Sequence, residues 1–162
     1  MIVDLAQALR AGMRRLASGV CVIAVNDAKL GRVAMTASSV TSVSDNPPSL
    51  LVCVNVNNNM AASMQGSLCF SVNVLSASQD AISVLCAGGA QGEKRFEEGD
   101  WRTDENTGLP YLNDAEAVFI CEKEQVIRHG THDIFIGNIT RVLTNSDPVN
   151  PLIYLNGGYH RL

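Results

Sequence analysis

The sequence predicts a mainly β protein with a few helices, folded as a closed or partly closed antiparallel barrel. About seven short apolar segments are separated by turn residues, a pattern typical of many short strands. Most of these segments follow one another without a long helix between them, which favours antiparallel pairing over a parallel α/β sheet. No repeat, low-complexity tract or boundary divides the 162 residues, so we expect a single domain, 1–162.

The composition is that of an ordered globular protein, with 46% hydrophobic and 17% charged residues. The formal net charge is -4, and no run of Lys or Arg is long enough to follow a phosphate backbone, which argues against a nucleic-acid partner. The N-terminal segment carries Arg10, Arg14 and Arg15 without an uninterrupted apolar core, unlike a signal peptide. No later stretch is long enough to span a bilayer, so no membrane association is expected.

The cysteines are odd in number and well separated, and no pair has the spacing of a CxxC redox or zinc motif. They are Cys21, Cys53, Cys69, Cys86 and Cys121. Most lie in apolar runs, so we interpret them as reduced, buried thiols of a cytoplasmic protein. A catalytic cysteine is left open, although nothing in the sequence marks one.

An amphipathic helix is predicted at the start of the chain, with Asp4 as its N-cap and Gly19 as its end. Its apolar face has near-helical spacing. That face consists of Leu5, Leu9, Met13 and Leu16. An apolar strand is expected over residues 20–26, followed by a turn over residues 27–31.

Residues 33–48, VAMTASSVTSVSDNPP, form the most informative stretch. β-branched residues alternating with small hydroxyl residues favour an extended segment, and Pro47-Pro48 should end its pairing because neither can donate to a ladder. The side chains of such a strand are too small to fill a core by themselves, but they make a low wall against which a flat ligand can lie. The alternative is a Ser/Thr-rich edge strand that faces water.

Strands are also expected over residues 49–55 and 67–75, separated by a short helix after the Asn57-Asn58-Asn59 cluster. This cluster can cap the helix or contact an anion. A second helix should open at Ser78 and end at Gly88-Gly89. The adjoining AGGAQG resembles a dinucleotide fingerprint only superficially, because it follows a helix instead of a strand.

Residues 91–107 are polar and predict a long surface excursion, the kind of loop that often carries function. Arg95-Phe96 combines a cation with an aromatic face, which suits a phosphate and a base or simply anchors the loop. Long strands are expected over residues 115–126 and 133–143, joined around residues 129–132, and one more strand through Tyr154.

The histidines do not predict a metal site. His129, His132 and His160 have no carboxylate at a telling distance along the sequence. His132, beside a turn glycine, is better interpreted as a hydrogen-bonding residue at a pocket rim or as a turn residue. The motifs of hydrolases, P-loop proteins and zinc proteases are also missing from the sequence.

An ordered series of segments along nearly the whole chain resembles the flavin reductase family, the small reductase components of two-component flavin monooxygenases. The matching segments are SGVCVIAV, MTASSVTSVSDNPPSLLVCVN, CFSVNVLSASQ, RF, W, GTHDIFIG and PLIYLNGGYHRL. The resemblance implies an FMN-binding split barrel, a Greek-key antiparallel barrel that is usually a homodimer. It also implies oxidation of NADH or NADPH and delivery of reduced FAD or FMN to a separate flavin-dependent monooxygenase.

The same resemblance implies where the ligands bind, without an obligatory catalytic residue and without a metal. The pyrimidine side of the flavin would face Met35, Thr36, Ala37, Ser38, Ser39 and Val40. Its phosphate or adenylate end would face Asn55, Asn57, Asn58, Asn59 and Arg95, with Phe96 on an adenine. The nicotinamide would lie against His132, Tyr154 and Tyr159.

NADH is favoured over NADPH because no Arg pair in the sequence offers an obvious seat for a second phosphate. Two other functions stay open on the same barrel. One is a non-catalytic flavin-binding or carrier protein. The other is an oxidase of the pyridoxamine phosphate type, for which this acidic chain has few basic residues.

Overall fold

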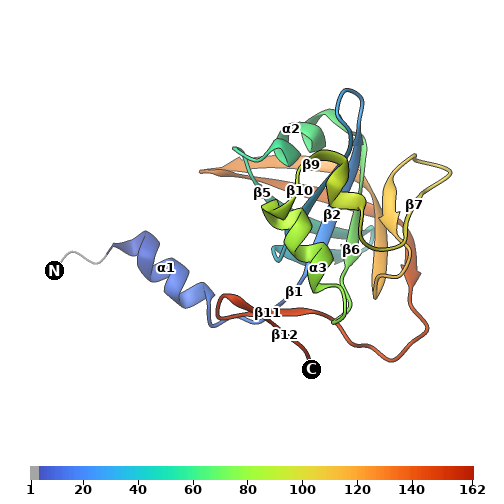
Figure 1. Cartoon of the computed structure of the whole chain (residues 1–162). Coiled ribbons are helices and arrows are strands. Elements are labelled where there is room, and N and C mark those ends of the chain that lie inside the picture. Colours follow the sequence, from blue (N-terminus) through green and yellow to red (C-terminus); the bar gives the residue numbers. More distant parts are fainter. Residues whose placement is uncertain (1–3) are drawn as a thin grey trace.

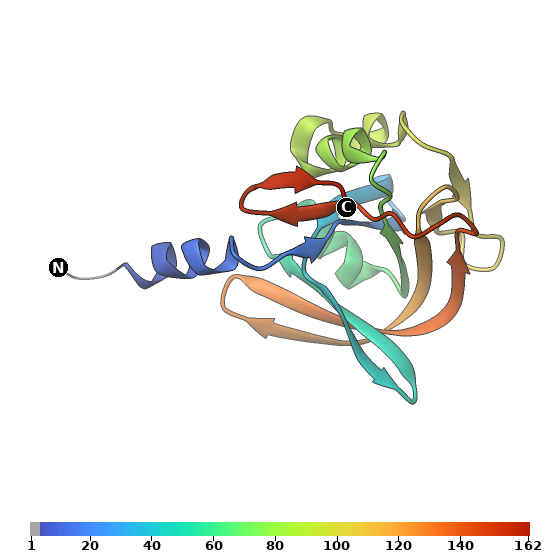
Figure 2. The same cartoon turned by 90° about the horizontal axis from the view of Figure 1, so that it is seen from below.

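The computed structural model describes residues 4–162 and is built around a seven-stranded antiparallel sheet that curls into a partly closed barrel (Figures 1 and 2). In spatial order its strands are β3 (Gly31–Ala37), β2 (Cys21–Asp27), β6 (Cys69–Val74), β9 (Ala117–His129), β10 (His132–Thr144), β5 (Pro48–Asn55) and β4 (Val40–Asp45). The predicted fold class, a mainly β antiparallel barrel, is confirmed.

Two small sheets and several short helices surround the barrel. The three-stranded sheet contains β1 (Ser18–Gly19), β11 (Ile153–Leu155) and β12 (Gly158–His160), and the two-stranded sheet contains β7 (Trp101–Thr103) and β8 (Pro110–Leu112). The helices are α1 (Leu5–Met13), α2 (Asn59–Gly66), α3 (Asp80–Val84), the π-helical turn η1 (Leu85–Gly89) and the 3-10 turn η2 (Gly92–Phe96).

Strand β2 is apolar and buried from Cys21 to Val25, because both of its faces are covered there. Ile23 and Val25 belong to the cluster inside the barrel, whereas Val22 and Ala24 belong to a second cluster on the outer face. The η1 and η2 turns and the β7–β8 sheet contribute to that second cluster. The sheet therefore has helical turns packed against its outside, and a cavity lies between them and β3.

Helix α2 fills one end of the barrel. Met60 and Met64 are fully buried in the inner cluster. The Asn58 side chain accepts a hydrogen bond from the Met60 amide at 2.9 Å, so it caps the helix as the sequence allowed.

Helix α1 differs from the prediction in two ways. It ends at Met13 instead of Gly19, because Ser18 and Gly19 pair with β11 as strand β1. Its Asp4 cap is confirmed by a 3.0 Å hydrogen bond from the Ala6 amide. None of its residues is buried, and Leu5 is 79% exposed; the helix projects away from the barrel beside the β11–β12 hairpin (Figures 1 and 2).

The informative stretch at residues 33–48 is two strands instead of one. Strand β3 ends at Ala37, and β4 starts at Val40 after a two-residue break. The prolines do not both end the pairing: Pro48 begins β5 and lies opposite Asp45 across the hairpin. At the C-terminus, the single predicted strand is a hairpin of β11 and β12.

The polar excursion at residues 91–107 contains η2 and β7, and it is tied to the barrel by Asp104. This carboxylate, whose side chain is 2% exposed, accepts from Arg141 Nη1 at 2.6 Å and from the amide and hydroxyl of Thr107. Burial alone would raise the pKa of Asp104, but the hydrogen bonds from Thr107 and Arg141 outweigh it and hold the pKa below its usual range.

Candidate active site

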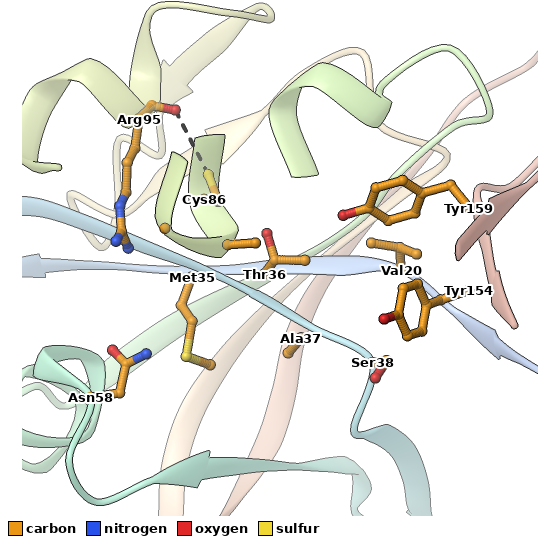
Figure 3. A pocket seen from close by; sticks show the side chains of 12 residues that line it. Val20, Met35, Thr36, Ala37, Ser38, Asn58, Cys86, Arg95, Tyr154 and Tyr159 are labelled. Atoms are coloured by element: carbon orange, nitrogen blue, oxygen red, sulfur yellow. Dashed lines mark hydrogen bonds between the residues drawn. The ribbon is translucent and has the colours of Figure 1, made fainter. Parts of the chain in front are cut away.

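A cavity of about 340 Å³ runs along strand β3 (Figure 3). One wall is formed by Met35, Thr36, Ala37 and Ser38, and Val20 also lines the cavity. The volume falls at the lower end of the range for small-molecule sites, about 300–1,000 Å³. The prediction that this stretch forms a wall beside a ligand-sized space is therefore consistent with the structure.

Strand β3 is the edge of the sheet and pairs only with β2. Every second residue of such an edge strand turns its N–H and C=O away from the neighbouring strand, so backbone donors and acceptors are available beside the cavity. The Thr36 hydroxyl is committed elsewhere, because it donates to the Ser83 carbonyl at 2.6 Å. Polar recognition along this wall thus falls mainly to the backbone.

Arg95 and Asn58 lie at one end of the cavity (Figure 3). Arg95 reaches there from η2, and its guanidinium donates to the carbonyl oxygens of Ala90 (2.8 Å) and Ala34. It forms no ion pair within residues 4–162, so its charge is available to an anion. A second cavity of about 310 Å³ continues past Arg95 and Asn58 toward Asn59.

Tyr154 and Tyr159 lie at the opposite end, beside Ser38 (Figure 3). Their ring centroids are 5.7 Å apart with the planes at 61°, an edge-to-face arrangement. The Tyr159 hydroxyl is 2.7 Å from Ser83 Oγ, which fixes the hairpin against α3. Each tyrosine is between a third and two-fifths exposed, so an aromatic surface faces the cavity mouth.

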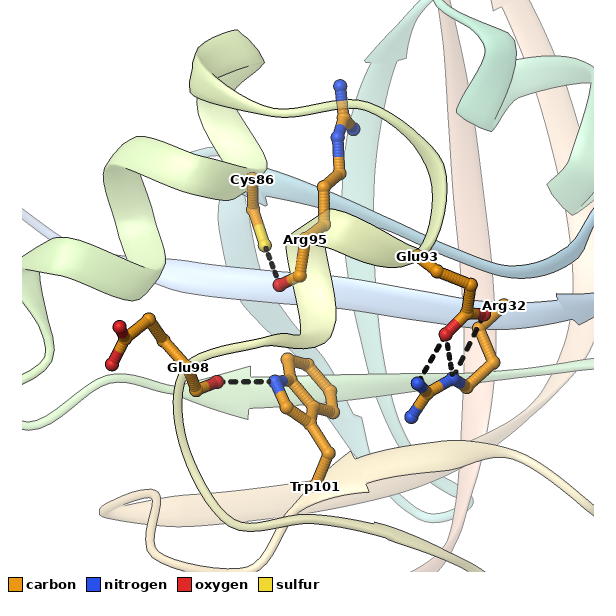
Figure 4. Close-up of polar contacts among 6 residues, drawn as sticks. All are labelled: Arg32, Cys86, Glu93, Arg95, Glu98 and Trp101. Atoms are coloured by element: carbon orange, nitrogen blue, oxygen red, sulfur yellow. Dashed lines mark hydrogen bonds and ion pairs between the residues drawn. The ribbon is translucent and has the colours of Figure 1, made fainter.

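Cys86 is the cysteine that lines this cavity, on the turn after α3. Burial raises its pKa to about 11, with Arg95 acting in the opposite direction. Its thiol donates to the Arg95 carbonyl at 3.7 Å (Figure 4). A raised pKa favours the protonated thiol at neutral pH, so Cys86 contributes a neutral side chain to this wall.

The structure thus brings part of the predicted set together. The residues that line the main cavity are Met35, Thr36, Ala37, Ser38, Asn58, Arg95, Tyr154 and Tyr159, and Asn59 lines the adjoining one. Sequence reasoning missed the opposite wall, at Cys86, Ala87 and Gly88. Gly88 has φ +113°, a conformation that suits glycine, so the Gly-rich end of the helix was the available signal.

Phe96 does not line the cavity. It is 7% exposed, packs edge-to-face on Trp101 with centroids 4.8 Å apart, and has the Arg32 guanidinium 4.3 Å over its other side. Arg32 in turn pairs with Glu93, and the Trp101 indole donates to the Glu98 carbonyl at 2.9 Å (Figure 4). In this conformation the ring anchors the loop, and an adenine has no free face on it.

His132 is also apart from the two tyrosines. It begins β10, opposite Asn55 on β5, and its Nδ1 is 3.0 Å from the Thr131 hydroxyl. Of the remaining predicted residues, Asn55 accepts from the Asn57 amide at 2.9 Å. The others outside the cavity lining are Ser39, whose hydroxyl donates to the Cys53 carbonyl, and Val40.

Within residues 4–162, no group of three or more His, Cys, Asp or Glu side chains is arranged to hold a metal ion. None of the helices in that range is long and apolar enough to cross a membrane.

Comparison with protein families shows that residues 13–162 match the "Flavin reductase like domain". The chain belongs to this family. It is 38% identical over 156 residues to FMN reductase (NADH) RutF from Enterobacter cloacae, covering 96% of this chain and 93% of that protein. It is 34% identical to an NADH:riboflavin 5'-phosphate oxidoreductase from Streptomyces pristinaespiralis, covering 95% and 86%.

Solved structures of flavin reductases have the same fold. A putative flavin reductase from Haemophilus somnus superposes with a TM-score of 0.91 at 36% identity, covering 99% of this chain and 100% of that one. BorF, the flavin reductase component of a bacterial two-component tryptophan halogenase, superposes with a TM-score of 0.88 at 32% identity, covering 97% and 98%. The architecture expected from the resemblance, the split barrel of flavin reductases, is confirmed.

Proposed function

We propose that this flavin reductase family member transfers hydride from NADH to FMN or FAD in the cavity along β3. The observation that carries the proposal is the edge of β3: it offers backbone hydrogen-bonding groups along one side of a cavity that has a cation at one end and two tyrosines at the other. The names of the relatives, NADH-dependent FMN reductase and NADH:riboflavin 5'-phosphate oxidoreductase, support the same activity.

The residues present fit a flavin. The backbone of residues 35–38 suits the polar edge of a flat ring, and Arg95 supplies an uncompensated charge for its phosphate. The second cavity, which shares Arg95 and Asn58 with the first, gives the phosphate end room to continue past the ring site. A bound flavin supplies the electron-accepting ring and reduced nicotinamide supplies the hydride.

The task of the protein is to hold two rings in contact and to exclude water, and this needs no acid or base from the chain. Tyr154 and Tyr159 give the nicotinamide an aromatic wall, and the bond from Tyr159 to Ser83 holds that wall in place. His132 stays a proposed nicotinamide contact, although it does not line the same cavity of the chain. Phe96 is proposed to support Arg95 through the loop and not to stack on adenine.

A homodimer is proposed because α1 presents an apolar face that its own chain leaves uncovered. Leu5, Leu9 and Met13 are 79%, 62% and 54% exposed along one stripe of the helix, and isolated apolar patches of this kind mark association sites. Leu9→Glu should shift the protein toward monomer in sedimentation or light scattering. Gln7→Glu adds the same charge on the side of the helix opposite Leu9 and should leave the dimer intact. Equal behaviour of the two variants would reject α1 as the contact.

The receiver of the reduced flavin is proposed to be a separate monooxygenase component. The support is that BorF is the reductase component of a two-component halogenase. The cytoplasmic location stays a prediction; all five cysteines are free thiols, as a reducing compartment requires.

The deciding experiment measures NADH loss by absorbance with purified protein, with and without added FMN or FAD. Rapid loss that depends on added flavin is the expected result and would identify flavin as a diffusible substrate. Tight flavin binding without oxidation of NADH or NADPH would instead favour a non-catalytic flavin carrier. Activity on a phosphorylated pyridoxamine but not on reduced nicotinamide would favour the oxidase alternative.

A further inference from the structure

We propose that a groove between α1 and the β11–β12 hairpin binds the pyrophosphate of the reduced nicotinamide dinucleotide, with Arg10 and Arg14 contacting its phosphates. The inference rests on the proposed reductase function, because it gives a binding site to the part of the reduced nicotinamide dinucleotide that does not react. It also identifies α1, which contributes nothing to the core of its own chain, as part of the substrate site.

The groove has a volume of about 560 Å³ and adjoins the main cavity. The two spaces share Ser38 and Tyr154, so Tyr154 separates the ring site on one side from the groove on the other. A nicotinamide held against the tyrosines is therefore within a few atoms of the groove along its own ribose.

The layout of the three cavities decides which ligand uses the groove. The cavity past Arg95 continues from one end of the ring site, and the α1 groove continues from the opposite end. Figure 3 shows these two ends, with Arg95 and Asn58 far from Tyr154 and Ser38. A flavin phosphate directed to Arg95 leaves the groove to the dinucleotide.

The distribution of arginine charge supports an anion at both ends. Five of the nine arginines form ion pairs within residues 4–162. The other four are Arg10, Arg14, Arg15 and Arg95. Three of these four line the main cavity or the groove, Arg95 at one end and Arg10 and Arg14 at the other.

The two groove arginines are arranged to act together. Arg10 lies in α1 and Arg14 is its C-cap, four residues on and still helical in its backbone, so the two project from the same side, one turn from each other. The Arg14 carbonyl accepts from the Asn156 amide at 2.9 Å, which ties the end of the helix to the hairpin. The Arg14 guanidinium lies against Gly157, where an added Cβ would collide with it, so the glycine makes room for the charge.

The chemistry of these side chains selects a phosphate over a neutral group. A guanidinium presents a planar set of N–H donors that matches phosphate oxygens in pairs and stays charged at any working pH. At about 100° per residue, Arg10 and Arg14 lie roughly a third of a turn from the apolar stripe of the helix. Met13, at the end of the stripe, borders the groove, whereas Leu5 and Leu9 do not line it. A second copy packed on Leu5 and Leu9 therefore does not have to cover the arginines.

The test compares Arg10→Gln and Arg14→Gln, each alone and combined in a double variant, with Arg15→Gln, which removes one charge just after α1 and outside the groove. We expect the double variant to raise KM for NADH about tenfold, with kcat and KM for FMN unchanged, since charged contacts of this kind are each worth a few-fold at an exposed site. KM for a phosphate-free N-alkyl dihydronicotinamide should not move. Arg15→Gln should behave as the unmodified protein.

A second measurement separates this inference from the function on which it rests. ADP-ribose carries the pyrophosphate but no nicotinamide, so its binding can be followed by calorimetry without any turnover. Binding to the unmodified protein that the double variant loses supports the groove even if no reductase activity is found. Three results would each overturn the inference. The double variant could keep its affinity for ADP-ribose, or its KM could rise equally for the phosphate-free donor. Its activity could also fall with FMN but not with riboflavin, which would place the arginines at the flavin phosphate.

Discussion

The hydrogen bond between Ser83 and Tyr159 offers a test of how the C-terminal hairpin is held at the site. The two hydroxyl oxygens are 2.7 Å apart, but Ser83 is fully buried whereas Tyr159 is 37% exposed. Ser83→Ala removes the buried partner and leaves the tyrosine hydroxyl at the surface, where water can replace the bond. Tyr159→Phe leaves the Ser83 hydroxyl buried without a partner.

The magnitudes follow from that asymmetry. A neutral hydrogen bond whose remaining partner is hydrated contributes about 1 kcal/mol, whereas an unsatisfied buried group costs about 1–3 kcal/mol. We therefore expect Tyr159→Phe to lower the free energy of unfolding by about 2 kcal/mol and Ser83→Ala by about 1 kcal/mol. In a chain of this length the difference corresponds to about 2–4 °C in Tm.

Urea unfolding of the two single variants and of the double variant measures all three values at one protein concentration, because a dimer's stability depends on concentration. The double variant should be close to Ser83→Ala, since the tyrosine hydroxyl has nothing left to satisfy. If Ser83→Ala costs as much as Tyr159→Phe, the serine hydroxyl has another partner, such as the Gln79 carbonyl one turn earlier, and the reasoning is wrong.

Three further outcomes test other parts of the structure. Gly137→Ala should lower the free energy of unfolding by about 1–3 kcal/mol, measured in urea, because its Cβ would lie 2.5 Å from Phe70 Cζ in the packed core. The Asp104–Arg141 pair should stabilise the fold fully above the carboxyl's unfolded pKa of about 3.9, and less as pH falls toward its depressed folded pKa. Thermal unfolding between about pH 2 and 6 should show this loss of stability, and Asp104→Asn should make Tm depend less on pH. His132→Ala should raise KM for NADH more than it weakens flavin binding, and equal losses would mark the histidine as structural.

Local pattern was sufficient for most strands of the barrel. The β9–β10 hairpin was predictable because long alternating segments flank a turn glycine, Gly130. The wall of the site was not decided by local pattern: from its residues alone, the stretch at 33–48 suited an edge strand facing water as well as a wall for a flat ligand. The resemblance assigned residues 35–40 to the flavin, and the structure places a cavity beside residues 35–38.

What could not be predicted depends on contacts between distant segments. Phe96 looked available for stacking, but Arg32 and Trp101 cover it, and neither contact is implied by local pattern. The wall at Gly88 exists because the turn after α3 packs against β3. In the sequence, this region showed only the AGGAQG segment, which did not fit a dinucleotide fingerprint. The predicted end of the first helix, Gly19, was wrong for the same reason, because Ser18 and Gly19 pair with the distant strand β11.

The argument for NADH from a missing arginine pair also fails on tertiary grounds. Arg10 and Arg14 are such a pair, but their relation to the site appears only once the β11–β12 hairpin returns to α1. The choice of NADH therefore depends on the relatives and not on the charge pattern.

Helix α1 connects the two proposals physically. Leu5 and Leu9 of the apolar stripe lie away from the groove that Arg10 and Arg14 line, and the end of the helix is tied to the barrel through the Asn156 hydrogen bond and strand β1. A short helix with no buried residue is marginally stable by itself, because most helical stability in proteins comes from packing of an apolar face. A second copy packed on the stripe would stabilise the helix and thereby hold Arg10 and Arg14 over the groove. Dimer formation and affinity for the dinucleotide should then be linked, since any interaction that orders α1 lowers the entropy lost when the phosphates bind.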